Sequence, residues 1–198
     1  MKIKFEKYNP EWELTFKEIK NELLNLINFV TPIIEHIGST SVKGLSSKPI
    51  IDILVGLNNE GDLDKITDPL MSEGYIYYEK YNEIMPYRRF FVKHKVNSKD
   101  LAIPVIIRKE DQIPNESVEH DYRLAHIHVL PYGSEHWIRH IAFRDYLRAH
   151  PVVKEEYQGL KQTLSVREWC DGNEYNEWKD DFIKREEKNA IKWYINNK

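Results

Sequence analysis

The chain has 198 residues, a formal net charge of −3 at neutral pH, 41% hydrophobic residues and 31% charged residues. This composition is ordinary for a globular protein with a buried core, and the length suits one domain with a helical appendage. The slightly acidic balance argues against a dedicated nucleic-acid binder, which usually carries a large positive charge. A single cysteine, Cys170, excludes an intrachain disulfide and a cysteine-based zinc cluster.

The N-terminal sequence MKIKFEKYNPEWE lacks the apolar region of a secretory signal peptide. No run of the sequence approaches the ~20 apolar residues that a membrane-spanning helix needs. We therefore expect a cytoplasmic protein that does not use a membrane as a partner.

Asn9 and Pro10 favour the start of a helix, because Asn caps a first turn and Pro is preferred at the first helical position. Apolar residues then recur at helical spacing, which predicts a helix that continues to Phe29. These residues are Trp12, Phe16, Ile19, Leu23 and Ile27.

Two strands with a polar connection are predicted next. Residues 33–37 are predicted to form a short strand, and residues 38–49 are small and polar, as in a loop. Residues 50–57 are apolar except for Asp52, which is typical of a central strand buried on both faces.

The remaining elements follow from periodicity and from the positions of Gly and Pro. Residues 97–123 are charged and poorly patterned, and part of this segment is predicted to be an exposed excursion. We predict a helix over 62–71, strands over 75–78, 89–92, 102–107 and 125–130, and helices over 134–150, 151–164 and 173–198. The chain therefore divides into an α/β core over 1–131 and a C-terminal helical subdomain over 132–198.

Gly38, Ser39, Thr40 and Ser41 have the composition of a phosphate-binding loop. A glycine lets the backbone approach a phosphate closely, and backbone N–H groups and hydroxyls can donate to its oxygens. A helix that begins just after the loop would add the positive end of its dipole. Because such runs are also common as ordinary turns, a second feature is needed to predict a site.

Asp52 supplies that feature, because a carboxylate inside an apolar strand is costly unless it is paired, hydrogen-bonded or bound to a metal. The alternative is a structural Asp satisfied by backbone donors or by a cation such as Lys48. A Gly-Ser turn followed by an acidic strand resembles the order in polymerase-β-like nucleotidyltransferases. In those proteins carboxylates bind the magnesium that bridges the triphosphate.

Three segments carry a closer resemblance. HIGSTSVKGLSSKPIIDILV (36–55), HIHV (126–129) and FRDYLRAHP (143–151) are similar to segments of the GrpB-like family. The resemblance runs from about Tyr8 to the C-terminal helix. It implies a nucleotidyltransferase-like α/β (α+β) fold, which is a mixed sheet with flanking helices and a C-terminal helical subdomain.

Two positions depart from the expected pattern. Active nucleotidyltransferases usually carry two acids that alternate on the strand, so that both face one side. Here Leu54 stands at the second acidic position, which weakens a standard two-metal mechanism. Lys43 stands where family members commonly have proline. Asp100 is a further candidate for the missing carboxylate, against the alternative of a solvated Asp at a strand end.

His126 and His128 are two residues apart on a predicted strand and therefore face the same side. With Asp52 they are the predicted ligands of Mg²⁺ or Mn²⁺, and Asp52 and His128 are the predicted catalytic residues. The alternative is a pair of hydrogen-bonded structural histidines.

Basic residues are predicted to neutralise the phosphates of a ligand. Arg88 and Arg89 precede an apolar strand, and either could instead be a surface arginine paired with an acid. A basic stripe at four-residue spacing follows on the predicted helix after Ser134. The residues assigned to phosphate are Gly38, Ser39, Thr40, Ser41, Lys48, Arg89 and Arg144.

The expected ligand is a nucleoside triphosphate or another phosphorylated small molecule, and nucleic acid is not an expected partner. The leading prediction is a nucleotide-binding protein that could transfer a nucleotidyl group to a small-molecule or protein acceptor. One alternative is a non-catalytic nucleotide sensor that lost the second acid. Another is a metal-dependent phosphohydrolase that uses Asp52 and the two histidines.

Overall fold

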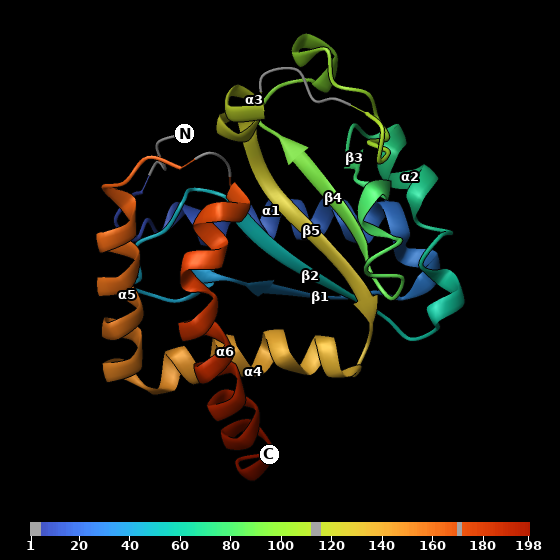
Figure 1. The fold of residues 1–198 in the computed structure, drawn as a ribbon. Helices are drawn as coiled ribbons and strands as arrows, with labels where there is room; N and C mark the ends of the chain where they lie inside the picture. The colour runs from blue at the N-terminus through green and yellow to red at the C-terminus, as the bar shows by residue number, and fades with distance from the viewer. Residues whose placement is uncertain (1–4, 112–115, 170–171) are drawn as a thin grey trace.

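The computed structural model describes residues 5–111, 116–169 and 172–198. Figure 1 shows the sheet at the centre, α1 behind it, and α4, α5 and α6 along its lower and left sides. The helices and strands are α1 (Glu11–Ile27), β1 (Ile33–Ile37), β2 (Ile51–Leu57), α2 (Thr67–Ser72), β3 (Ile76–Tyr77), β4 (Arg89–His94), α3 (Glu116–Tyr122), β5 (Arg123–Pro131), α4 (Glu135–Ala149), α5 (Pro151–Ser165) and α6 (Gly172–Asn196).

The sheet has five strands in the order β1-β2-β5-β4-β3. β2 and β5 are parallel, whereas β1 pairs antiparallel with β2, and β4 pairs antiparallel with both β5 and β3. The mixed sheet with flanking helices confirms the predicted fold class. Because β2 and β5 lie inside the sheet and both of their faces are covered for much of their length, the apolar run at 50–57 is explained.

One face of the sheet packs on α1 and α2 and forms the main core. α1 begins as predicted, since the Asn9 side chain accepts a hydrogen bond of 3.0 Å from the Glu11 N–H. Its apolar stripe then lies against alternate residues of β2 and β5. The buried residues of this core include Trp12, Ile19, Leu23, Ile27, Ile51, Ile53, Val55, Ile127 and Val129.

The opposite face carries Asp52 and is partly covered by α4. The Ser134 hydroxyl caps α4 by accepting a hydrogen bond of 3.2 Å from the Trp137 N–H. Trp137 packs on Leu54 in a second cluster, and a Cβ added at Gly56 would lie 2.7 Å from its ring. α4 also packs against α6. The predicted boundary between residues 131 and 132 lies at the end of β5, and α4 rests on the sheet directly after it.

The strand predicted over 102–107 is wrong. The structure has a 3-10 turn over Ser98–Leu101, then Ala102 with a φ of 52°, and only one isolated bridge, from Ile106 to Tyr77. Pro104 has no N–H to donate to a strand ladder, which is the physical reason that this apolar segment stays irregular.

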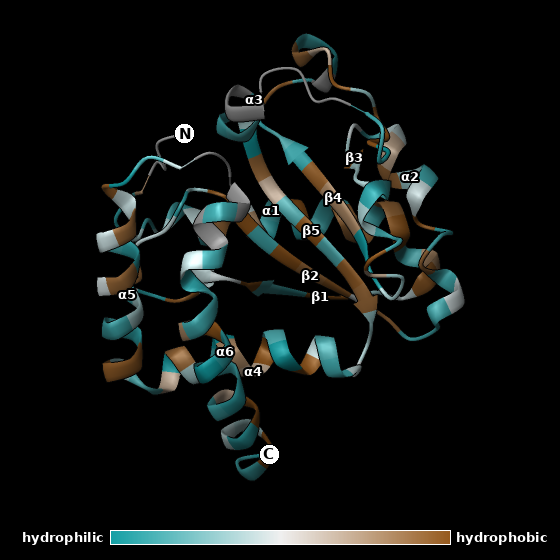
Figure 2. Ribbon diagram, viewed as in Figure 1, coloured by the Kyte–Doolittle hydropathy of each residue, from teal (hydrophilic) through white to brown (hydrophobic). Residues whose placement is uncertain are grey.

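Smaller differences concern element ends. The helix predicted over 62–71 is formed only over Thr67–Ser72, after a 3-10 turn at Glu60–Asp62. The excursion predicted within 97–123 ends in α3, and its residues 112–115 lie outside the described residues, as does Cys170. None of the described helices combines the length and the apolar character that crossing a membrane requires. Figure 2 shows the hydrophobic residues concentrated in the strands, with mixed character in α4, α5 and α6.

Candidate functional site

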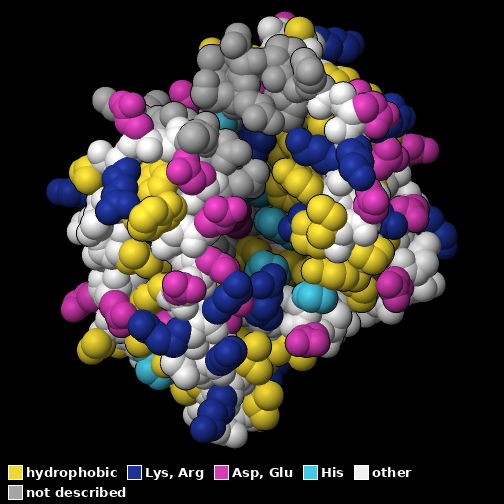
Figure 3. Space-filling view, in the orientation of Figure 1, with side chains coloured by type: hydrophobic (Ala, Val, Ile, Leu, Met, Phe, Trp, Pro, Cys, Tyr) yellow, Lys and Arg dark blue, Asp and Glu magenta, His cyan; other side chains and the backbone are white. Residues whose placement is uncertain are grey.

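Asp52, His126 and His128 lie together on the sheet face opposite α1, which is called the Asp52 face below. The parallel register of β2 and β5 pairs Asp52 with His126 and Leu54 with His128. The side chains are 32%, 19% and 16% exposed, respectively. Figure 3 shows this side of the molecule hollowed at its centre, with histidine side chains at the bottom and Lys or Arg side chains around them.

A chain of polar contacts crosses the Asp52 face. His126 Nδ1 lies 3.2 Å from Asp52 Oδ1, and His128 Nε2 lies 4.0 Å from the same oxygen. The other ring nitrogens face arginines, at 3.4 Å from Arg123 to His126 Nε2 and 3.5 Å from Arg88 to His128 Nδ1. A guanidinium group only donates, so each nitrogen facing an arginine presents its lone pair. The proton of each ring therefore points toward Asp52.

The protein environment keeps both imidazoles neutral. Burial lowers the pKa of His126, and the hydrogen bond and charge of Asp52 only partly oppose that effect. Burial also lowers the pKa of His128 well below its usual value, and the nearby charge of Arg88 lowers it further. At pH 7 both rings are then uncharged.

This arrangement predicts two different tautomers. At pH 7 we expect neutral His126 to carry its proton on Nδ1 and neutral His128 to carry its proton on Nε2, because an arginine faces the other nitrogen of each ring. Long-range ¹H–¹⁵N correlation spectra distinguish the two tautomers by the shifts of the ring nitrogens. Identical tautomers at the two positions would contradict the network, and Asp52→Asn provides the control that removes the shared carboxylate.

The residues present do not fit a resident metal ion. Asp52 Oδ1 faces two ring N–H groups, and the lone pairs of both histidines face guanidinium groups, so the three predicted ligands do not converge on one point. Among the residues that the structure describes, no group of three or more His, Cys, Asp or Glu side chains could hold a metal. Binding of Mg²⁺ or Mn²⁺ by Asp52, His126 and His128 stays a prediction.

The 38–41 loop meets the Asp52 face at Gly38. The backbone of Gly38 has a φ of 68° and a ψ of −172°, a conformation that residues other than glycine rarely adopt. A Cβ added there would lie 2.9 Å from Asp52 Cγ and still closer to Oδ2. The close approach between loop and carboxylate therefore requires glycine, and the predicted pairing of this loop with Asp52 is present in the structure.

A group of three lysines, called the lysine cluster below, gathers where the 38–41 loop meets α5 and α6. Lys161 on α5 donates to Ser39 Oγ at 3.1 Å and to the Ser46 carbonyl at 2.6 Å. Lys179 on α6 and Lys48, just before β2, are near enough to Asp52 for its charge to act on both. The Lys161 and Lys179 side chains are buried, so the cluster places positive charge in a region with little water.

Burial and neighbouring cations lower the pKa values of all three lysines. Burial and then the charge of Lys179 lower the pKa of Lys161 to about 7. Burial and then the charge of Lys48 lower the pKa of Lys179 to about 7, while Asp52 opposes the shift. Burial and then the charge of Arg123 lower the pKa of Lys48 to about 8. An anion bound here would relieve this repulsion and raise all three pKa values.

The prediction that Arg89 belongs to the site is wrong. Arg89 pairs with Val129 in the sheet register and therefore points to the α1 side, where its Nε donates to Asp64 Oδ1 at 2.5 Å. Strand alternation explains the error, because the residues directly before and after Arg89 in the sequence point to the Asp52 face. Arg88 takes the position near His128 instead.

Thr40, Ser41 and Arg144 are not brought to the Asp52 face either. The Thr40 hydroxyl lies 3.0 Å from His36 Nε2, and the Ser41 hydroxyl donates to the Gly38 carbonyl at 2.7 Å. Arg144 pairs with Glu35. Thr40, Ser41 and Arg144 line a separate cavity at the outer edge of β1.

Several residues of the site lie outside the sequence prediction. Lys161 and Lys179 look like ordinary amphipathic-helix residues in the sequence, and only the packing of α5 and α6 brings them to the loop. His140 belongs to the basic stripe at four-residue spacing, with His136, Arg144 and Arg148, and its ring lies 5.8 Å from that of His128. Strand alternation would place Arg123, three residues before His126, on the opposite face of the sheet, and the β4–β5 register is irregular at this end of the strands.

Comparisons with known proteins agree with this fold. YqkA of Bacillus subtilis is 30% identical over 97% of this chain, and this chain spans 48% of the length of YqkA. Glutamate-rich protein GrpB of Alkalihalophilus pseudofirmus is 29% identical, with 89% of this chain and 88% of that protein matched.

Two solved structures are similar to this chain in architecture. The crystal structure of the conserved protein GrpB from Enterococcus faecalis has a TM-score of 0.74 and 29% identity, and covers 96% of this chain and 99% of that chain. The Cid1 poly(U) polymerase with bound MgGTP has a TM-score of 0.50 and 10% identity, covering 82% of this chain and 45% of Cid1. That likeness concerns the fold alone, and it identifies the sheet and its helices as nucleotidyltransferase-like. The family model described as GrpB protein matches residues 2–189, and this chain belongs to the GrpB family.

Proposed function

We propose that the protein binds a nucleoside triphosphate or a similar phosphorylated small molecule on the Asp52 face. The lysine cluster and the 38–41 loop hold the phosphates, and the rest of the ligand lies along the hollow over β5 and β4. The contact of Lys161 with Ser39 of the glycine-containing loop, together with Lys48 and Lys179 near Asp52, is the observation that carries this proposal. Cations whose pKa values are lowered by burial and by neighbouring positive charges form a favourable place for a polyanion.

Binding without chemistry fits the Asp52 face better than nucleotidyl transfer. Leu54 occupies the strand position of a second acid and is buried under Trp137. Asp52 is engaged with His126, and the two histidines hold neutral rings between Asp52 and arginines. These contacts support a ligand-binding or nucleotide-sensing role.

Nucleotidyl transfer is the second candidate, because Asp52 and Gly38 are in direct contact on this fold. In that reading Asp52 would hold a divalent ion bound with the ligand, and the ion would neutralise charge on the phosphates. The two candidates differ in their requirement for metal, and one experiment separates them.

The test is calorimetric titration of the four common nucleoside triphosphates at pH 7, in EDTA and then in Mg²⁺ or Mn²⁺. We expect one triphosphate to bind in EDTA, and Lys161→Met to weaken its affinity by about tenfold or more, because a hydrogen bond from a charged donor contributes about 1.5–3 kcal/mol. The matched control is Lys65→Met, which removes an exposed lysine paired with Asp62. Binding should weaken as the pH rises from 7 to 9, since lysines with pKa values of about 7 to 8 lose their charge there.

Two results would overturn the proposal in different ways. Equal affinity in wild type, Lys65→Met and Lys161→Met would remove the lysine cluster from the ligand site. Binding that appears only with metal, disappears in Asp52→Asn and accompanies release of pyrophosphate would instead establish nucleotidyl transfer.

A further inference from the structure

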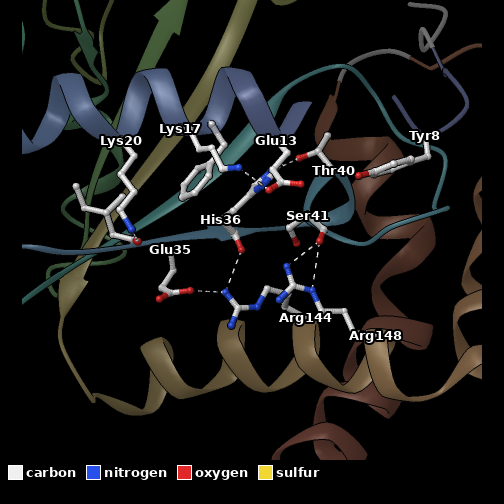
Figure 4. A pocket seen from close by; sticks show the side chains of 12 residues that line it. Tyr8, Glu13, Lys17, Lys20, Glu35, His36, Thr40, Ser41, Arg144 and Arg148 are labelled. Carbon is white, nitrogen blue, oxygen red and sulfur yellow. Dashed lines mark hydrogen bonds and ion pairs between the residues drawn. The ribbon is translucent and has the colours of Figure 1, made fainter. Parts of the chain in front are cut away.

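A second cavity lies at the outer edge of β1, between α1 and α4, and is called the edge pocket below. Its volume is about 320 Å³, and its lining includes Thr40 and Ser41, which form the back of the 38–41 loop. Figure 4 shows lysine side chains entering it from α1 above and arginine side chains from α4 below, with β1 between them. The residues of the Asp52 network do not line it.

The free edge of β1 supplies backbone groups to the edge pocket. Lys20 Nζ donates to the Ile34 carbonyl at 3.0 Å, and Arg144 donates to the His36 carbonyl at 3.1 Å. Both carbonyls therefore point away from β2. In an antiparallel strand the N–H and C=O of one residue point to the same side, so the Ile34 and His36 N–H groups also face the edge pocket. These N–H groups are donors suited to an oxyanion.

Cations outnumber acids in the edge pocket. Lys17, Lys20, Arg144 and Arg148 line it together with only two carboxylates, those of Glu13 and Glu35. The Lys20 ammonium uses one of its three protons on the Ile34 carbonyl, which leaves two for a ligand.

The acids already occupy positions that a ligand anion could take. Glu13 pairs with Lys17 at 2.8 Å, and both side chains are 60% exposed. Glu35 pairs with Arg144 at 2.6 Å and is 38% exposed. The exposed Glu13–Lys17 pair contributes only about 0–1 kcal/mol, so a ligand anion can replace Glu13 at little cost.

One wall of the edge pocket is flat and uncharged. The Phe16 and His36 rings stack with centroids 4.6 Å apart and an angle of 13° between their planes. Burial lowers the pKa of His36 to about 4, although the charge of Asp52 opposes the shift, so the ring is neutral at pH 7. Such a wall, with Tyr8 nearby, suits the planar part of a ligand.

We propose that the edge pocket binds a small molecule that combines an oxyanion, either phosphate or carboxylate, with a planar ring. Lys17, Lys20 and the outward N–H groups of β1 hold the oxyanion, and the ring lies toward Phe16 and His36. This site is separate from the proposed nucleotide site and does not depend on it.

Phenyl phosphate and benzoate are the probes, because each joins one oxyanion to one ring. Calorimetric titration of the whole protein should show a single site for at least one probe, and benzyl alcohol, which lacks the charge, should not bind. The double variant Lys17→Met/Lys20→Met should lower probe affinity by about tenfold or more. Because Lys17 is exposed, Lys17→Met alone is a second variant that keeps the fold, and it should lower affinity by a smaller factor.

Two controls separate this site from the lysine cluster. Lys109→Met, which removes an exposed lysine paired with Glu83, should leave probe affinity unchanged. Lys161→Met should also leave it unchanged while weakening triphosphate binding. Absence of probe binding, binding of benzyl alcohol with equal affinity, or loss of probe binding in Lys161→Met but not in the double variant would each overturn the proposal.

Discussion

Glu119→Gln should lower the free energy of unfolding by about 3–5 kcal/mol, the cost of removing one partner from a buried ion pair. The Glu119 carboxylate is 1% exposed and accepts hydrogen bonds from His94 at 2.6 Å, Arg123 Nε at 3.0 Å and Tyr78 at 3.2 Å. Replacing the carboxylate by a neutral amide leaves the Arg123 charge buried without its counter-charge. This cluster ties α3 to β4 and β5 beside the Asp52 face.

The pH dependence of this contribution has a definite sign. Burial alone would raise the pKa of Glu119, but the hydrogen bonds from His94 and Arg123 outweigh it and lower the pKa to about 2. A carboxyl group with a lowered pKa stabilises the fold above its unfolded pKa, and this stabilisation is lost as the pH falls through the folded pKa. Wild type should therefore lose this stabilisation between about pH 4.5 and pH 2.

Urea denaturation of both proteins at pH 7 and pH 3 measures the effect. The difference between wild type and Glu119→Gln should be smaller at pH 3 than at pH 7. Glu22→Gln is the matched control, because its partner Lys93 and its own side chain are partly exposed, and it should cost only about 0–1 kcal/mol. Equal losses in the two variants would show that the buried cluster contributes no more than a surface pair.

Gly38→Ala should lower stability by about 3 kcal/mol, which corresponds to a fall in Tm on the order of 10 °C for a chain of this length. Two effects add together. The backbone conformation at Gly38 is strained for any other residue, and the added methyl group would meet the Asp52 carboxylate. The Asp52 side chain is held by His126, so it cannot move aside without breaking that contact.

Gly74→Ala separates these two effects. Gly74 also has a positive φ, of 82°, but a Cβ added there would meet nothing within 4 Å. Its substitution should cost about 1 kcal/mol, from backbone strain alone. Thermal unfolding followed by circular dichroism gives both values. A Gly38→Ala protein as stable as Gly74→Ala would mean that the loop and Asp52 do not touch in solution.

Local patterns in the sequence predict much of the fold. β1 and β2 agree with their predicted ranges to within one residue, because Pro32 and the polar loop mark their ends. α5 begins at Pro151, where a proline is favoured. The apolar run at 102–107 shows the limit of such patterns, because Pro104 within it has no N–H to donate to a strand ladder.

The sequence predicts only part of the candidate site. Strand alternation correctly joined Asp52, His126 and His128, since their arrangement depends on one register between neighbouring strands. The lysine cluster depends on the angle at which α5 and α6 pack on the 38–41 loop, and helical periodicity carries no information about that angle. Arg88 and Arg89 differ by a single residue of register, and the predicted residue, Arg89, lies on the other face of the sheet.

The residues of the 38–41 loop face two different sides of the protein. Ser39 meets Lys161 on the side of α5, while Thr40 and Ser41 belong to the edge pocket, within one 3-10 turn. So short a turn cannot move on one side and stay in place on the other. Any molecule whose binding displaces this turn from one side therefore changes the affinity for a ligand on the other side, and thermodynamic linkage requires the reverse effect to be equally large. A turn of three residues would in this way couple ligand binding in the edge pocket to ligand binding at the lysine cluster.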